Sequence, residues 1–293
     1  MAVFDGERST WGTLRGYQDY IWRGGRIMEH EFDVVKVFRW VDDNLFVKNL
    51  TYTCDMKSII SRSVELGVAT IEEKSTGFAD EQKFIGFIWD GVAKTVRLPE
   101  KKLTQRKSQI AAFLEKGMAF KFNNTEVLAG RLNHVSFLLP QLQCYIRSIC
   151  WWMNQWKKRW ATREIAGDVQ EDLKFWLDTL NVYNHTRLCP ETEPIEIGWV
   201  GDASTSYGIG VLIGRNWAQL KSKTGWSVGE PPCGIAWLET VAIRIGIIML
   251  QALERNVQGN KLIVYTDNTT TEEVLRSRKS KDHHSNQEWK RIQ

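Results

Sequence analysis

The sequence of 293 residues has only six prolines and five cysteines. The cysteines are odd in number and include no C-x-x-C pair, which argues against a disulfide framework and against structural zinc. No apolar run approaches the roughly 20 residues that span a bilayer. The first 20 residues are too mixed and charged for a signal peptide. We therefore expect an intracellular protein of the cytoplasm or nucleus, with no membrane partner.

The composition is that of a globular protein, because hydrophobic residues make up 43% of the chain and charged residues 25%. The length predicts about two domains. Charge is distributed unevenly: residues 97–163 hold 13 lysines and arginines against three glutamates, a net +10, whereas the whole chain carries +4. Such a basic block is typical of a surface that binds a polyanion, and a solvated helix surface is the alternative.

Tryptophan is abundant, with 14 in the chain, and four of them lie among basic residues between positions 151 and 160. Aromatic rings beside basic side chains suit a nucleic-acid backbone with stacked bases, although a tryptophan stripe on a helix is more often core. The candidate nucleic-acid contacts are Lys101, Lys102, Arg106, Lys107, Lys157, Lys158 and Arg159.

The hydrophobic pattern predicts both helices and strands. Residues 34–48 have a strand–turn–strand pattern, with Asp42, Asp43 and Asn44 at the turn. Adjacent acids at a hairpin tip are commonly turn formers, and on their own they indicate nothing more. The other expected elements are a helix over 55–67, a hairpin turning at residues 90–91, helices over 101–163 and 168–180, a three-stranded meander after Pro194, a helix over 235–255 and a strand over 261–267.

Three carboxylates occupy positions where an acid is costly. Asp202 lies at the end of an apolar strand, Glu239 lies within an apolar helix, and Asp267 ends a continuous hydrophobic run. A buried carboxylate needs a basic partner, a hydrogen-bond cage or a metal. Arg244, five residues after Glu239, would point elsewhere on the helix. Because oxygen ligands favour magnesium or manganese, the three acids predict a divalent-metal site, and surface carboxylates at element ends are the alternative.

Four segments together resemble the reverse transcriptase–ribonuclease H region of a retroelement polyprotein, most like that of fungal tyrosine-recombinase (DIRS-like) retrotransposons. Trp40-Val41-Asp42-Asp43 is similar to the Y-x-D-D box of a polymerase palm. KFIGFIWDG…KTVRLPEKKL resembles the passage from palm to thumb, and LAGRLNHVSFLLPQLQCYIRSI resembles the thumb that follows. GDASTSYGIGVLIG…WLETVAI…LIVYTDN resembles ribonuclease H, whose acids come from the first strand, first helix and fourth strand.

The resemblance implies an α+β fold: a partial palm over 1–100, a helical basic thumb over 101–163, a connection over 164–193, and an incomplete ribonuclease H-like mixed sheet with helices over 194–293. It implies that Asp42 and Asp43 are palm carboxylates, and that Asp202, Glu239 and Asp267 are ribonuclease H ligands. Each site would hold two Mg²⁺ or Mn²⁺ ions, and the partner would be an RNA–DNA hybrid or another nucleic acid.

The chain departs from the family pattern at both ends. No acid upstream of Asp42 lies in a convincing strand, and the fingers are missing. Asp282 comes too soon to be the fourth ribonuclease H acid. We therefore expect a truncated fragment or a degenerate copy. The alternatives are a non-catalytic nucleic-acid-binding protein that retains the basic thumb, and a decayed chain with neither activity.

Overall fold

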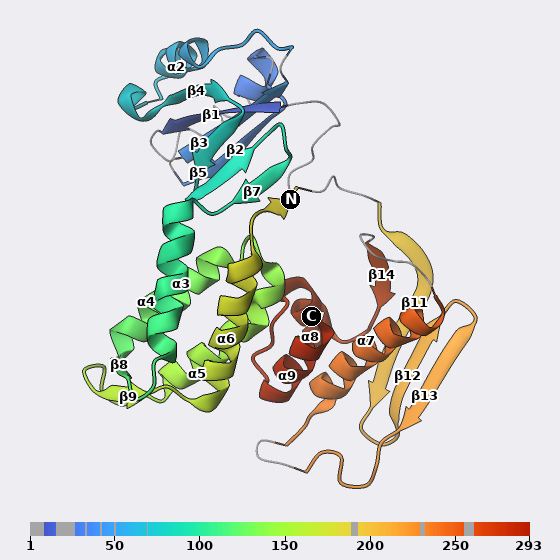
Figure 1. Ribbon diagram of the computed structural model, residues 1–293. Helices are drawn as coiled ribbons and strands as arrows, with labels where there is room; N and C mark the ends of the chain where they lie inside the picture. The colour runs from blue at the N-terminus through green and yellow to red at the C-terminus, as the bar shows by residue number, and fades with distance from the viewer. Residues whose placement is uncertain are drawn as a thin grey trace. The chain divides into compact units, whose positions relative to one another are not determined.

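The computed structural model describes residues 9–15, 27–32, 34–41, 43–49, 51–68, 70–188, 193–228, 232–254 and 261–293, and only the backbone of residues 9–15. The chain divides into two compact units (Figure 1). The first comprises residues 1–105 and 182–191, and the second comprises residues 106–181 and 192–293. The predicted α+β class is confirmed. The division into palm, thumb, connection and ribonuclease H-like parts stays a prediction.

The first unit is built around two four-stranded sheets, ordered β2-β3-β1-β4 and β10-β7-β6-β5. Its elements are β1 (Ser9–Arg15), β2 (Lys36–Trp40), β3 (Asp43–Asn49), α2 (Met56–Glu65), the 3₁₀ turn η1 (Glu72–Lys74), β4 (Thr76–Ala79), β5 (Glu81–Phe84), β6 (Phe87–Asp90), β7 (Thr95–Arg97) and β10 (Thr186–Arg187). The helix α3 (Glu100–Leu114) begins in this unit and continues into the second.

The predicted hairpin over 34–48 is confirmed. Strands β2 and β3 pair antiparallel with Trp40 opposite Asp43, so Asp43 and Asn44 lie in β3 and not at the turn as predicted. Val41 in this turn has φ 55°, a left-handed conformation that costs energy in a β-branched residue.

The predicted helix over 55–67 is also confirmed, with its expected ends. Asp55 accepts a hydrogen bond from the backbone N–H of Ser58 at 2.8 Å, which caps α2. Gly67 ends the helix at φ 71°. The expected hairpin at residues 90–91 forms between β6 and β7. A second tight turn at Ile85 and Gly86, which was not predicted, joins β5 to β6.

The second unit combines helices with a four-stranded sheet that contains both antiparallel and parallel strand pairs (Figure 1). Besides the rest of α3, its elements are β8 (Ala119–Lys121), α4 (Phe122–Val135), the 3₁₀ segment η2 (Pro140–Ile146), α5 (Arg147–Asn154), β9 (Thr162–Glu164), α6 (Gly167–Val182), β11 (Ile195–Ser204), β12 (Gly208–Ile213), β13 (Asn216–Lys221), α7 (Ile235–Ala252), β14 (Leu262–Tyr265), α8 (Thr269–Ser277) and α9 (His283–Ile292).

The prediction of helices throughout residues 101–163 was wrong after Pro140. The chain first forms the 3₁₀ segment η2, then the short α-helix α5, which ends at Asn154. Proline at the start of η2 fits this, because proline is tolerated only in the first turn of a helix. Beyond α5, residues 162–164 pair antiparallel with residues 119–121 in a two-stranded ladder, β8 with β9, which was not predicted.

The sheet of the second unit has the order β13-β12-β11-β14. Strands β11, β12 and β13 form the predicted antiparallel meander, and β14 adds parallel to β11 after the crossover helix α7. Buried side chains of β11, β12 and α7 form the core between them. By length and composition alone, α7 could cross a membrane, but here it contributes its buried residues to this core.

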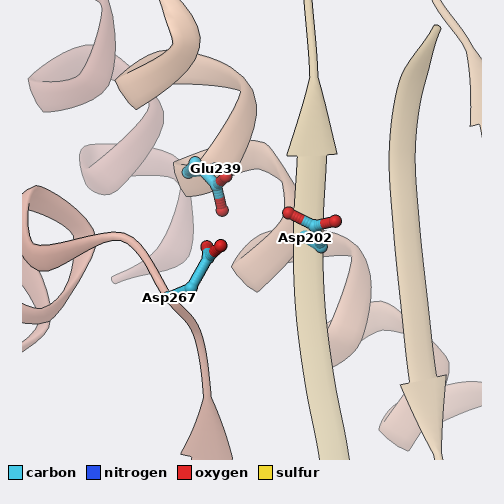
Figure 2. A group of neighbouring side chains, drawn as sticks. All are labelled: Asp202, Glu239 and Asp267. Atoms are coloured by element: carbon cyan, nitrogen blue, oxygen red, sulfur yellow. The ribbon is translucent and has the colours of Figure 1, made fainter.

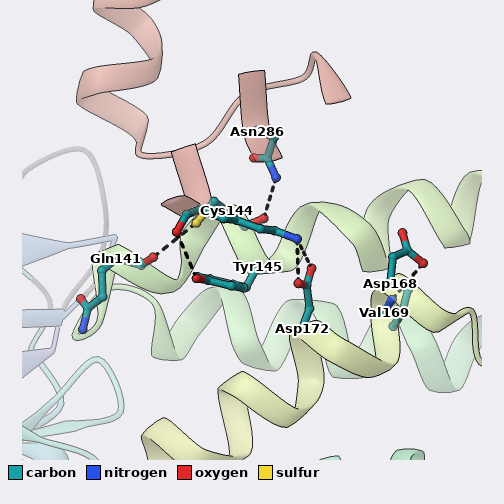
Figure 3. A network of polar contacts seen from close by, with 8 residues as sticks. Gln141, Cys144, Tyr145, Asp168, Val169, Asp172 and Asn286 are labelled. Atoms are coloured by element: carbon teal, nitrogen blue, oxygen red, sulfur yellow. Dashed lines mark hydrogen bonds and ion pairs between the residues drawn. The ribbon is translucent and has the colours of Figure 1, made fainter. Parts of the chain in front are cut away.

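The polar segment at the end of the chain is buried more than its composition suggests. In α9, Glu288 is 1% exposed and forms ion pairs with Arg244 and Arg291. Lys290 donates to both carboxylate oxygens of Asp172 in α6, at 2.6 and 2.7 Å. The Asn286 amide donates to the Cys144 carbonyl at 3.0 Å (Figure 3). Paired in this way, polar side chains join α9 to η2 and α6.

Candidate metal centre in the second unit

The three acids singled out from the sequence come together from three different elements (Figure 2). Asp202 lies on β11, Glu239 lies in the second turn of α7, and Asp267 follows the end of β14. Because β11 and β14 are parallel neighbours, their carboxyl ends meet at one edge of the sheet. Ligand oxygens of the three side chains all lie within 4.8 Å of one another.

Close packing of α7 on the sheet brings Glu239 to this edge. A Cβ atom at Gly246 would collide with the indole of Trp199, so glycine is what allows the helix to lie flush on β11. Nearer the site, an ideal Cβ at Gly201 would lie 3.7 Å from the Cβ of Ala242, an ordinary contact. Glu239 precedes Ala242 by about one helical turn, which places its carboxylate beside Asp202.

Glu239 is the buried member of the group. Its residue exposure is 3%, whereas Asp202 and Asp267 are exposed. Burial, with a smaller contribution from the neighbouring charge of Asp202, raises the pKa of Glu239 from 4.5 to about 7. In the described part of the chain no lysine or arginine forms an ion pair with any of the three acids. Arg244 points away from Glu239, as its spacing predicted, and pairs with Glu288.

The donor set fits a hard divalent cation. Three carboxylates offer oxygen ligands only, the type that Mg²⁺ and Mn²⁺ prefer. Asp202 uses Oδ1 to accept the N–H of Ala203 at 2.8 Å, and its second oxygen makes no hydrogen bond to a described residue. Asp282 does not join the group, because its Oδ1 caps α9 by accepting from the N–H of Ser285 at 2.7 Å.

The pair expected to serve a polymerase palm is described only in part. Asp42 lies outside the described residues. Asp43 begins β3, where it is half-buried and pairs with Trp40 across the hairpin. Over the ranges that the structure covers, Asp202, Glu239 and Asp267 form the one group of three metal-ligating side chains, and Asp43 belongs to none.

The basic residues expected on α3 differ in their exposure. Lys101 is exposed, and Lys102 and Lys107 are half-buried. The Lys102 amine donates to the Gly86 carbonyl at 3.3 Å. Arg106 is only 8% exposed, which leaves little of its guanidinium for a phosphate. Burial lowers the pKa of Arg106, and nearby Arg131 lowers it further.

The second basic group, Lys157, Lys158 and Arg159, lies exposed in the turn after α5 rather than on a helix. Lys158 lies 5.2 Å from the ring centre of Trp160, which is 71% exposed. Arg159 lies over the Phe122 ring at 4.1 Å and pairs with Glu126 at 2.8 Å. Neither partner of Arg159 was predicted, since no sequence pattern links positions so far apart.

The helices and sheets described above define a chain of the reverse transcriptase–ribonuclease H-like fold. One solved structure that shares the fold is the foamy viral protease–reverse transcriptase in complex with an RNA/DNA hybrid, with a TM-score of 0.51 and 10% sequence identity. The alignment covers 99% of this chain and 43% of the viral one, so this chain spans less than half the length of its structural neighbour. No protein-family model and no curated protein matches the sequence.

Proposed function

We propose that the chain is the reverse transcriptase–ribonuclease H region of a retroelement, and that its second unit is a metal-dependent nuclease for the RNA strand of an RNA–DNA hybrid. The observation that carries this proposal is the convergence of Asp202, Glu239 and Asp267, one of them buried, with no cationic partner among the described residues. The sequence motifs favour an element of the tyrosine-recombinase kind. The hybrid in the structure of the foamy viral neighbour supports the choice of substrate.

Asp202, Glu239 and Asp267 would hold the divalent ions. In two-metal sites such ions activate the attacking water and stabilise the leaving oxygen. The fold positions the ligands: α7 holds Glu239 on the buried side of the site. Asp202 and Asp267 are exposed, so the site is accessible to a polymer. Because the Glu239 pKa is about 7, its carboxyl must lose a proton before it can bind a cation, so cation binding releases a proton near neutral pH.

The test is cleavage of a hybrid whose RNA strand is labelled, with Mg²⁺ or Mn²⁺. We expect the chain to cleave this RNA strand, to leave the DNA strand intact, and to lose activity in Asp202→Asn. Glu171→Gln is the matched control, because Glu171 is an exposed acid on α6. Equal cleavage by wild type and Asp202→Asn would mean that a contaminating nuclease is responsible. Absence of any divalent-ion binding by the wild-type chain would contradict the proposal outright.

A second candidate is a nucleic-acid-binding protein without catalysis. It is favoured by the exposed turn of Lys157, Lys158 and Arg159 beside exposed Trp160, which combines phosphate-binding charge with a stacking surface. Binding of a hybrid in the presence of a chelator, together with no cleavage in its absence, would favour this candidate over the nuclease.

A further inference from the structure

The two strands that carry the aspartates pair in two different registers. Near the start of β11, Ile195 lies opposite Leu262 of β14, whereas further along Trp199 lies opposite Val264. Four steps along β11 therefore correspond to two steps along β14. The difference is a bulge of two extra residues in β11, between Ile195 and Trp199.

Gly198 makes this bulge possible. Its φ of +65° lies in the left-handed region, which glycine enters without steric cost. An ideal Cβ at this position would lie 3.3 Å from the backbone nitrogen of Gly214, tighter than most real contacts. The carbonyl of Gly198 still accepts a hydrogen bond from the Gly214 N–H at 3.1 Å, so the bulge keeps its pairing toward β12.

Glu196 ties the bulge to the neighbouring strand. Its Oε1 accepts the backbone N–H of Gly198 at 2.6 Å, and its Oε2 accepts the hydroxyl of Tyr265 at 2.6 Å. These hydrogen bonds hold the pKa of the Glu196 carboxyl below its usual value, so it is an ionised acceptor at neutral pH. One carboxylate thus joins the extra residues of β11 to the last residue of β14.

The register after the bulge decides how close the two aspartates come. Val200 lies opposite Tyr265, and Asp202 and Asp267 each follow two residues later, Asp267 just beyond the end of β14, so continuing this register sets the two aspartates level. In the register before the bulge, Asp202 would be level with Thr269, displaced by roughly 7 Å at about 3.3 Å per residue. Two oxygens on one Mg²⁺ ion are at most about 4 Å apart, so this displacement would separate the ligands.

We propose that Glu196, Gly198 and Tyr265 form a register clamp, a set of positioning residues that sets Asp202 beside Asp267 for a shared divalent ion. The inference deepens the proposed function and rests on it. A two-residue bulge suits this purpose, because an even slip changes the register without turning any side chain of β11 to the other face of the sheet.

The test measures Mn²⁺ affinity of the full chain by calorimetric titration at a temperature well below unfolding. Tyr265→Phe removes one hydroxyl, and we expect it to weaken Mn²⁺ binding about threefold to tenfold, the value of one hydrogen bond. Glu196→Ala should weaken it at least as much. Glu196→Gln should restore much of the affinity, because an amide can accept from the Gly198 N–H and donate to the phenol oxygen.

Tyr207→Phe is the matched control, since this exposed tyrosine in the turn after β11 keeps the ring that lies near Lys221. We expect it to bind Mn²⁺ like wild type. We expect the metal-free melting temperature of Tyr265→Phe to stay close to that of wild type. Unchanged Mn²⁺ affinity in Tyr265→Phe and Glu196→Ala would overturn the clamp and leave the proposed function standing, whereas a wild-type chain that binds no Mn²⁺ would overturn both.

Discussion

Replacing Glu239 by glutamine should stabilise the metal-free chain above neutral pH. In the fold Glu239 is 3% exposed and its carboxyl lies beside two other acids, so its charged form is disfavoured relative to the unfolded chain. Glutamine keeps the size of the side chain and removes the charge. The substitution should therefore remove a destabilisation of the fold that the wild-type chain has only at pH values at which Glu239 is ionised.

The direction of the pH effect on stability follows from the pKa values of Glu239 in the folded and unfolded chain. The folded chain binds a proton at Glu239 up to about pH 7, whereas the unfolded chain loses it near 4.5. The free energy of unfolding therefore falls as pH rises through this window, and the penalty is complete above pH 7 and absent below 4.5. The full difference corresponds to about 3 kcal/mol. Because Asp202 and Asp267 are exposed and solvent screens their charges, we expect about 1–2 kcal/mol.

The assay is urea denaturation from pH 5 to 8.5, followed by tryptophan fluorescence, with and without Mn²⁺. Wild type should lose stability relative to Glu239→Gln as pH rises, and Glu171→Gln, an exposed acid in the same unit, should follow wild type. Mn²⁺ at 100 times its dissociation constant should add about 2.7 kcal/mol to wild type and much less to Glu239→Gln.

Two results would refute this reasoning. A difference between wild type and Glu239→Gln that does not change with pH would show that the carboxyl does not titrate in this window. A loss of stability in Glu239→Gln at every pH, with no response of wild type to Mn²⁺, would mean that Glu239 is an acid satisfied by hydrogen bonds and is no metal ligand.

Other substitutions test the basic turn, the terminal helix and the packing of α7. Changing Lys157, Lys158 and Arg159 to alanine should weaken hybrid binding and reduce the slope of log affinity against log salt by up to about 3, and an unchanged slope would mean that these charges face solvent. The chain should not extend a primer on an RNA template with Mg²⁺, and extension above background would contradict this. Lys290→Met should cost about 3–5 kcal/mol in denaturation, because it leaves Asp172 buried without its ion pair, and replacing both partners by apolar residues should recover most of the loss. Gly246→Ala should cost about 1–3 kcal/mol by forcing α7 away from Trp199, and a neutral effect would show that the helix shifts freely.

Elements with strong local signals could be predicted from the sequence. The helix α2 has its cap at Asp55 and its stop at Gly67, so both ends follow from residue chemistry. The meander β11–β13 follows from short apolar runs with tight turns between them. The 3₁₀ segment η2 and the β8–β9 pairing could not be predicted in this way, because they depend on contacts between residues far apart along the chain.

The terminal helix α9 shows how tertiary contacts override composition. Its sequence, HHSNQEWKRI, is polar and predicts a solvated surface helix, yet Asn286 and Glu288 are buried. Both of these side chains have a partner that lies elsewhere in the fold or one turn away: the Cys144 carbonyl for Asn286, and Arg244 and Arg291 for Glu288. Hydrophobicity alone misjudges such a segment, since burial of a polar group depends on whether a partner is present.

For the candidate site, the sequence pattern predicts which residues are the ligands, whereas only the fold shows how far apart they lie. That Asp202, Glu239 and Asp267 belong together could be inferred, since each is an acid in or at the end of an apolar element. Their separation could not, because the bulge at Gly198 shifts β11 by two residues against β14 while leaving its inward and outward faces unchanged. An alternating pattern identifies the face of a strand and does not report an even slip. The distance on which metal binding depends is thus set by residues outside the ligand set.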